Sequence, residues 1–241
     1  MSKYKKSYKN SRRNNPSIQI TKTQKQSQEI SILQSRIDNE TPQPGYAPPL
    51  HQTITFRSLP LSNNTLRGLE EGSSGGGSSS SSSTNGGKKT KSFTIMTDIQ
   101  NATIPHALAG RDILGAARTG SGKTLAFLVP LLEKLYRERF SAMIDGLGGL
   151  VLSPTRELAV QIFQVLRTVG SFHNFSAGLL VGGKKEFALE QSRVGGMNII
   201  IGTPGRVLQH LEQTPGFEVG GLLMLILDEA GMYFDSAFQH F

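Results

Sequence analysis

Two short stretches of this sequence combine residue types that can handle phosphate. The first is ARTGSGKT, residues 117–124, in which small residues precede a lysine and a threonine. Small residues let consecutive backbone N–H groups wrap an anion, while Lys123 adds a positive charge and Thr124 a hydroxyl ligand for a metal ion. Ala117 stands where the general pattern G-x-x-x-x-G-K-[ST] begins with glycine. The plainer alternative is a glycine-rich turn that contains a lysine by chance.

The second stretch is LMLILDEAG, in which an apolar run leads directly into Asp228 and Glu229. In an open α/β sheet, ligands bind at the carboxyl ends of the strands. Asp228 could hold Mg²⁺ there, and Glu229 could orient or deprotonate a water molecule. Alone, this pair would be read as a solvated strand end. Together with the phosphate-loop pattern, it predicts the second half of a nucleotide site.

The elements that must position these residues alternate regularly from Lys91 onward. The sequence predicts strands over 111–117, 147–154, 175–183, 197–203 and 222–229. It predicts helices over 122–140 (with Pro130 as a candidate kink), 155–170, 186–194 and 204–213. Because the strands are almost entirely apolar and each crosses over through a helix, we expect an α/β fold. Its parallel sheet should be covered by helices on both faces.

The N-terminal part looks different. Residues 1–50 are predicted to be a disordered basic and Pro-rich tail, with a short helix over Glu29–Ile37. A second short helix, capped by Ser62 or Asn63, should run to about Glu71. The run GSSGGGSSSSSSTNGG cannot bury a core, and it could be a linker between domains or a loop inserted into one.

Charge and composition indicate which classes of protein this chain can belong to. Residues 1–40 carry a net charge of +6 out of +8 for the chain. Such a tail can bind polyanions by counterion release, or be a solvated arm or a nuclear address. The absence of cysteine excludes disulfides and thiolate metal sites. Neither a membrane span nor a secretory signal is evident, so we expect a soluble intracellular protein without a membrane partner.

Several motifs in order resemble one family. From about Phe56 to its end, the chain resembles the DEAD-box RNA helicases, on IPHALAGRDILGAARTGSGKTLAF, SPTRELAVQIF and RVLQHLEQTP. Within them it is most similar to a nucleolar subgroup that acts in small-ribosomal-subunit biogenesis. The resemblance implies a RecA-like P-loop NTPase fold with ATP and Mg²⁺ as cofactors. It also implies RNA bound through its backbone, RNA-stimulated ATP hydrolysis coupled to local duplex unwinding, and a pre-ribosomal assembly in the nucleolus, without homo-oligomers.

The resemblance also assigns roles to individual residues. Lys123, Asp228 and Glu229 would be catalytic, with Thr124 and Asp228 on the metal. Phe56 would stack on the adenine and Gln100 would read its edge. The phosphates would lie on Ala116, Ala117, Arg118, Thr119, Gly120, Ser121, Gly122, Lys123 and Thr124. RNA would contact Pro154, Thr155, Arg156, Gly182, Gly183, Thr203, Pro204, Gly205 and Arg206; for the glycine pair, a simple strand-end turn is the alternative.

The same resemblance implies domain boundaries, and the chain differs from the family pattern in two places. Residues 51–241 would form a partial helicase ATP-binding domain, with a Q-motif region over 56–100 and a Gly/Ser-rich insertion at 72–91. Gly231 stands where the family has a second aspartate, and the sequence ends before the family's Ser-Ala-Thr motif and second RecA-like domain. We therefore expect an incomplete sheet and a marginally stable fragment. A non-catalytic RNA- or partner-binding module is the alternative function.

Overall fold

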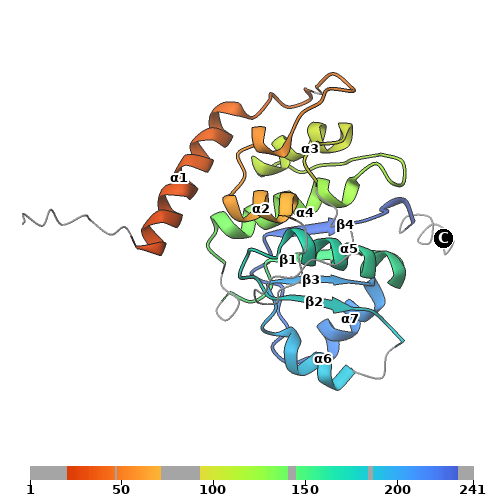
Figure 1. The fold of residues 1–241 in the computed structure, drawn as a ribbon. Coiled ribbons are helices and arrows are strands. Elements are labelled where there is room, and N and C mark those ends of the chain that lie inside the picture. The colour runs from red at the N-terminus through yellow and green to blue at the C-terminus, as the bar shows by residue number, and fades with distance from the viewer. Residues whose placement is uncertain (1–20, 47, 72–92, 141–144, 184–186, 233–241) are drawn as a thin grey trace, which may run out of the picture.

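A four-stranded parallel sheet forms the centre of the molecule (Figure 1). The structure, a computed structural model, describes residues 21–46, 48–71, 93–140, 145–183 and 187–232. The strands are β1 (Gly149–Leu152), β2 (Ala177–Leu180), β3 (Ile199–Gly202) and β4 (Met224–Leu227). Their order across the sheet is β2-β3-β1-β4, and all neighbouring pairs are parallel. Strands that follow one another along the chain are joined by crossovers that contain helices.

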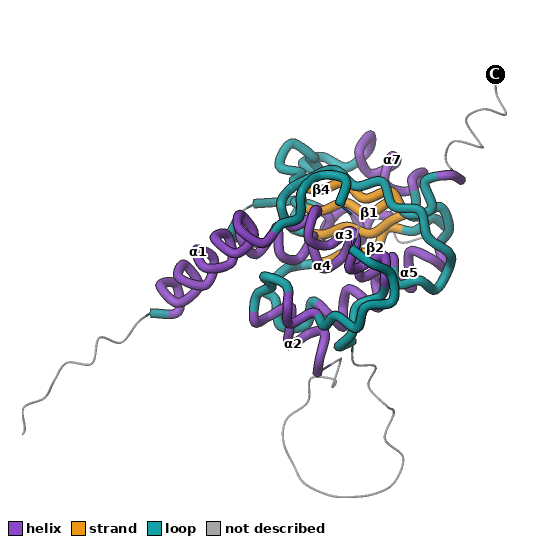
Figure 2. The backbone as a smooth tube through the Cα atoms, turned by 90° about the horizontal axis from the view of Figure 1, so that it is seen from above, coloured by secondary structure: helices purple, strands orange, loops and turns teal. Residues whose placement is uncertain are grey.

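Helices cover both faces of this sheet, as the strand sequences predict. The helical elements are α1 (Lys22–Glu40), the 3-10 turn η1 (Phe56–Ser58), α2 (Asn63–Glu71), α3 (Asp98–Leu108), α4 (Lys123–Arg137), α5 (Arg156–Val169), α6 (Phe187–Val194) and α7 (Pro204–Gln213). Seen along the sheet, α4 and α5 lie on one side of the strands and α7 lies on the other (Figure 2). Within the described residues, no helix is both long and apolar enough to cross a membrane.

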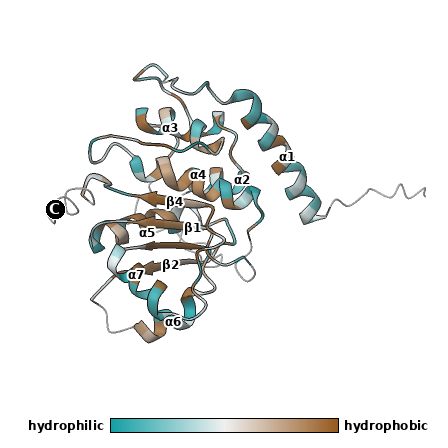
Figure 3. Cartoon of the chain, turned by 180° about the vertical axis from the view of Figure 1, so that it is seen from behind, coloured by the Kyte–Doolittle hydropathy of each residue, from teal (hydrophilic) through white to brown (hydrophobic). Residues whose placement is uncertain are grey.

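The strands place apolar side chains on both faces, and Figure 3 shows them as hydrophobic throughout. Val151 and Ile201 pack into a core with α4 and α5. Leu150 and Ile200, one residue earlier on the same strands, pack into a second core with Val207 of α7. Successive side chains of a strand point to opposite faces, so a sheet covered on both sides needs apolar residues at every position.

One predicted strand is wrong. Residues 111–118 form no strand, and Leu114 in their middle is 96% exposed. Among the described residues, β4 pairs only with β1, and Leu225 and Leu227 on β4 remain 54% and 47% exposed. A strand is stable only if a neighbour satisfies its backbone groups, and residues 111–118 have no such neighbour here. The apolar character of this segment was therefore not enough to predict whether it joins the sheet.

The predicted N-terminal tail is also wrong over part of its length. Lys22–Glu40 is a helix of 19 residues, where the sequence predicted disorder to residue 28 and a helix only over Glu29–Ile37. It begins with a capping box between Thr21 and Gln24. Leu33 and Ile37 are buried, at 5% and 2% exposure, which supplies the tertiary contact that a polar helix needs. Residues 1–20 and the predicted insertion at 72–91 lie outside the described residues.

The other predicted elements are present: α2 and α7 have the predicted bounds, and the remaining strands and helices are shorter than predicted. α2 begins at Asn63, α5 is capped by Thr155, and Pro204 occupies the first turn of α7. α4 runs through Pro130, which is buried inside it. The helix continues past this proline to Arg137, and a kink at Pro130 stays a prediction.

A buried polar cluster connects α2, α4 and the loop after α5. Glu133 on α4 is fully buried, and its Oε1 accepts hydrogen bonds from the backbone N–H of Ser62 at 3.0 Å and from its hydroxyl at 2.7 Å. Thr65 Oγ1 lies 2.9 Å from Nε2 of His173. Burial raises the pKa of Glu133 and lowers the pKa of His173 to about 4. The cluster therefore favours a neutral imidazole at position 173.

We predict that His173 makes the free energy of unfolding depend on pH. The unfolded chain takes up a proton on this ring near pH 6.5, whereas the folded chain does so only near pH 4. Because the pKa of His173 is lower in the folded chain, its contribution to the free energy of unfolding is complete above pH 6.5. That contribution is lost as the pH falls through the folded-state pKa of about 4. The loss attributable to His173 should reach about 3 kcal/mol between these two values.

Urea titrations of the wild type and of His173→Gln between pH 7 and pH 4.5 measure this effect. Glutamine can still hydrogen-bond Thr65 but does not titrate. The difference in unfolding free energy between the two proteins should shrink or reverse as the pH falls. Parallel pH profiles for the two proteins would contradict the assignment.

Candidate functional site

The residues singled out by the sequence lie at one edge of the sheet. Thr155 follows β1, Gly182 follows β2, Thr203 follows β3, and Asp228 follows β4. Because all four strands are parallel, these positions are all at the carboxyl edge (Figure 1). The structure thus brings together segments that are far apart in the sequence.

The phosphate-loop pattern forms a turn that leads into α4. Gly122 is the N-cap of α4 and has a φ of 94°, while Gly120 has a φ of 77°. Only glycine adopts these angles without strain, and the turn exposes backbone N–H groups at the positive end of the helix. The Ser121 hydroxyl oxygen is buried without a hydrogen-bond partner among the described residues. An unpaired donor in such a turn fits an anionic ligand.

Gln100 fixes the position of this loop. Its side chain is 2% exposed, and its Nε2 donates to the carbonyl of Gly122 at 2.9 Å. Its Oε1 accepts from the backbone N–H of Thr97 at 2.9 Å, at the start of α3. A Cβ on Gly122 would overlap the Gln100 amide, so this position requires glycine for space as well as for conformation. Both polar ends of Gln100 bind protein, and its contact with adenine stays a prediction.

The two acidic residues meet the loop through Lys123. Its Nζ donates to Oε1 of Glu229 at 2.8 Å, and Glu229 has a φ of 51°, in the left-handed region. Ser153 donates from its hydroxyl to Oδ2 of Asp228 at 3.3 Å. Burial, followed by the neighbouring charge of Glu229, raises the pKa of Asp228. The structure therefore joins the phosphate loop to the acidic strand end, as the sequence predicts.

The donor set suits a magnesium ion that is held mainly by phosphate and water. Mg²⁺ typically takes one or two protein oxygens, and Asp228 and Thr124 offer a carboxylate and a hydroxyl. Among the described residues, no group of three or more His, Asp or Glu side chains could hold a metal ion.

Phe56 does not present an open ring. It is 2% exposed and packs in the main core at the start of η1. Its backbone N–H donates to the carbonyl of Thr94 at 3.1 Å. The ring anchors this segment to the core, and its stacking on a base stays a prediction that requires the ring to be uncovered.

The predicted RNA-contacting residues fall into an accessible group and a buried one. Arg156 is exposed at the start of α5, and a Cβ on Gly183 would overlap its guanidinium. Gly183 has a φ of 85°, so it needs glycine for its backbone angle too. Thr203 and Pro204 begin α7, whose first turn faces the same edge. Arg156 and these helix starts can present donors to phosphates.

Arg206 belongs to the buried group. Its side chain is 7% exposed, and its Nε donates to Oε2 of Glu190 at 2.8 Å. The same carboxylate oxygen lies 2.9 Å from Nε2 of His210, and the guanidinium lies over the ring of Phe187. Arg206 thus ties α7 to α6, and it is not free to contact RNA in this arrangement. We propose it as a structural residue.

Sequence reasoning missed Ser153 and Glu190. Ser153 comes directly after β1, one residue before the predicted RNA motif, so its position at the strand end was the available signal. Glu190 gave no such signal, because its partner Arg206 is sixteen residues away and on another helix.

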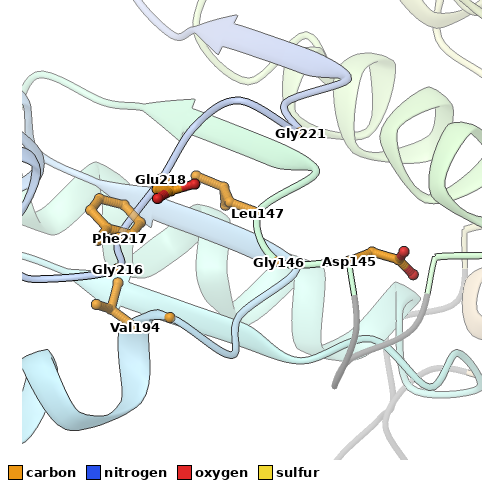
Figure 4. A pocket seen from close by; sticks show the side chains of 9 residues that line it. Asp145, Gly146, Leu147, Val194, Gly216, Phe217, Glu218 and Gly221 are labelled. Atoms are coloured by element: carbon orange, nitrogen blue, oxygen red, sulfur yellow. The ribbon is translucent and has the colours of Figure 1, made fainter.

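A separate hollow of about 230 Å³ lies at the opposite edge of the sheet (Figure 4). Its walls include Gly146 and Leu147, which precede β1, and Gly221, which precedes β4. This edge holds the amino ends of the strands, so the hollow is not part of the candidate site.

Comparisons with known proteins agree with this geometry. The family model for DEAD/DEAH box helicase matches residues 97–240, more than half of the chain. The chain is 53% identical over 184 residues to DEAD-box ATP-dependent RNA helicase 32 of Arabidopsis thaliana, covering 76% of this chain and 22% of the relative. It is 47% identical over 228 residues to ATP-dependent RNA helicase DBP4 of Coccidioides immitis, covering 95% of this chain and 24% of the relative.

Solved structures show the same fold. A crystal structure of a DEAD box protein from Methanococcus jannaschii matches with a TM-score of 0.61 and 30% identity, covering 78% of this chain and 45% of that one. The crystal structure of a hypothetical ATP-dependent RNA helicase from Sulfolobus tokodaii matches with a TM-score of 0.51 and 31% identity, over 60% of this chain and 40% of that one. The RecA-like fold is thereby confirmed. The chain spans about a quarter of the length of the curated relatives, and it belongs to the DEAD/DEAH box helicase family.

Proposed function

We propose that this chain is the ATP-binding part of an ATP-dependent RNA helicase, in which RNA-stimulated ATP hydrolysis drives local unwinding of RNA duplexes. The observation that carries this proposal is the contact between Lys123 and Glu229, because it joins a glycine-rich turn at a helix start to the acidic end of β4. The names of the similar proteins, ATP-dependent RNA helicases, support it. Residues 51–241 would form the domain, with the Q-motif region at 56–100 and the insertion at 72–91.

The residues of the loop would bind the triphosphate. Backbone N–H groups from Ala116 to Gly122, and the buried Ser121 hydroxyl, would donate to phosphate oxygens. Lys123 would exchange its contact with Glu229 for the β- and γ-phosphates. That exchange would free the Glu229 carboxylate to orient or deprotonate the attacking water. A magnesium ion held by Asp228 and Thr124 would neutralise charge on the phosphates.

The carboxyl edge of the sheet would also hold RNA. Arg156, Thr155 and the start of α7 are accessible there, and contacts of this kind bind the backbone with little sequence preference. The basic N-terminal residues would add sequence-independent affinity. The proposed setting is a pre-ribosomal assembly in the nucleolus, and its support is the resemblance of the motifs to that subgroup together with the basic tail.

A non-catalytic RNA- or partner-binding module remains the second candidate, and Gly231 favours it. The family has a second aspartate at this position, and a Cβ at Gly231 would meet nothing within 4 Å. The residue is exposed, so space does not require glycine. A change to aspartate would therefore fit, which makes the contribution of this carboxylate to RNA-stimulated hydrolysis directly measurable.

We predict opposite effects for the two partners of the ion pair. Lys123→Ala removes the cation that would hold the phosphates and should abolish binding of Mg·ATP. Glu229→Gln removes the competing charge beside Lys123, so it should keep or tighten nucleotide binding while lowering hydrolysis by at least about 100-fold.

Binding of a fluorescent ATP analogue and release of radiolabelled phosphate, with and without RNA, would measure both steps. Lys134→Ala is a matched control, because Lys134 lies further along α4 and forms an ion pair with the exposed Glu138. RNA binding by the wild type without any turnover, even in Gly231→Asp, would identify the non-catalytic module instead.

We predict that Arg156 and Arg206 act differently, although both belong to the predicted RNA set. Arg156→Ala should weaken RNA binding for all sequences and lower the salt dependence by about one counterion, with little change in stability. Arg206→Ala leaves the nearly buried Glu190 without its cation, so it should destabilise the fold by about 3 kcal/mol.

Fluorescence anisotropy with labelled single-stranded RNA over a salt series, and urea unfolding of the same preparations, would separate the two effects. If Arg206→Ala lowers RNA affinity without lowering stability, the structural role of Arg206 is wrong.

A further inference from the structure

The helix α1 is attached to the body of the protein through an acidic side chain near its middle. Glu29 Oε1 accepts a hydrogen bond from the backbone N–H of Asn63 at 2.8 Å, and its Oε2 accepts from the hydroxyl of Tyr136 at 2.6 Å. Burial and the nearby carboxylate of Glu29 raise the pKa of Tyr136, so this hydroxyl stays a donor. Glu29 therefore joins the first residue of α2 to the last turn of α4. Figures 1 and 3 show α1 beside these helices.

A basic side chain attaches the second half of α1. The guanidinium of Arg36 donates to the carbonyls of Ser58 at 2.9 Å and of Leu59 at 3.4 Å. These two carbonyls lie at the end of the η1 turn that begins with Phe56. On the same face of α1, Leu33 and Ile37 are buried. Positions 29, 33, 36 and 37 have the spacing of one helical face, so α1 presents a single surface to the protein.

The segment that Arg36 holds is connected to the nucleotide site. Phe56 donates its N–H to the carbonyl of Thr94 at 3.1 Å, and Met96 donates to the carbonyl of Ile54 at 2.8 Å. Directly after this pairing, Thr97 begins α3 and binds the side chain of Gln100. Gln100 in turn donates to the carbonyl of Gly122 in the phosphate loop. A continuous set of backbone and side-chain contacts thus leads from α1 to that loop.

We infer that α1 is a positioning element of the nucleotide site, and that Glu29 and Arg36 set the affinity for the adenosine part of the ligand. This inference rests on the proposed function, because it assumes that the loop and Gln100 bind ATP. Its physical basis is that the contacts of Glu29 and Arg36 are directional hydrogen bonds to backbone groups and a hydroxyl. The contacts of Arg36 end on the segment around Phe56, and those of Glu29 end on the first residue of α2 and on the last turn of α4.

The test compares two ligands on the full chain. Calorimetry measures the dissociation constants of Mg·ATP and of inorganic tripolyphosphate, which has the phosphates but no adenosine. For Arg36→Ala, the loss of two hydrogen bonds should weaken ATP binding roughly fivefold, with tripolyphosphate affinity unchanged within about twofold. Glu29→Ala should behave in the same way. Arg36→Lys can still reach one carbonyl and should recover part of the ATP affinity.

Two controls separate positioning from general stability. Ile32→Ala changes a side chain on the outer face of α1 that is 61% exposed. Glu40→Gln removes the ion pair of Arg36 within the helix but leaves the donors of Arg36 in place. Both should bind ATP like the wild type. Circular dichroism melts of every variant accompany the binding measurements.

Each result of these binding and melting measurements either supports or overturns the proposed role of α1. Selective loss of ATP affinity supports the inference. Equal loss for both ligands, or a lower melting temperature with unchanged ATP affinity, overturns it and leaves α1 as a stabilising helix. If either alanine variant does not fold, Glu29→Gln and Arg36→Lys decide by the same selectivity. A wild type that binds tripolyphosphate but not ATP, or neither ligand, contradicts the proposed function itself.

Discussion

The hydrogen bond from the Gln100 amide to the Gly122 carbonyl is the contact on which the candidate site depends. Residues 111–118, which lead into the phosphate loop, are not part of the sheet, so no strand fixes the loop from that side. The loop leads directly into α4, and its position is fixed by that helix and by Gln100 in the first turn of α3. Because Gln100 is buried and uses both polar atoms of its amide, this placement is directional.

The sheet contributes the other half of the site. Parallel pairing of β4 with β1 puts Asp228 beside Ser153, and Asp228 is followed by Glu229 with its left-handed backbone. That backbone angle is costly for a residue other than glycine, and it is typical of functional positions. The resulting contact with Lys123 joins two parts of the molecule that are supported by different elements. The site is therefore assembled from a sheet edge and a helical layer that meet through one ion pair.

Several charged side chains of this protein stabilise the fold, although the sequence motifs around them do not indicate that role. Arg206 lies in a motif expected to bind RNA, yet it forms a nearly buried ion pair with Glu190 between α6 and α7. Glu29 and Arg36 lie in what the composition describes as a basic tail, yet they hold backbone groups of the body. Burial fixes the use of Arg206, since a buried charge must be paired. Glu29 and Arg36 are only partly buried, and their use follows from the groups of the body that they hydrogen-bond.

The sequence by itself determined the alternation of strands and helices, the glycine-rich turn with Lys123, and the two carboxylates after an apolar run. Each of these is a local pattern, set by side-chain size, polarity and periodicity. Tertiary structure alone decided that residues 111–118 lie outside the sheet, because a strand exists only if a neighbour satisfies its backbone. It likewise decided that Lys22–Glu40 is a helix longer than its pattern indicated, because docking of Leu33 and Ile37 supplies stability that propensity lacks. The distant partners of these side chains were undetermined for the same reason: Glu190 for Arg206, Gly122 for Gln100 and Glu229 for Lys123 each lie far away along the chain, and no spacing encodes them.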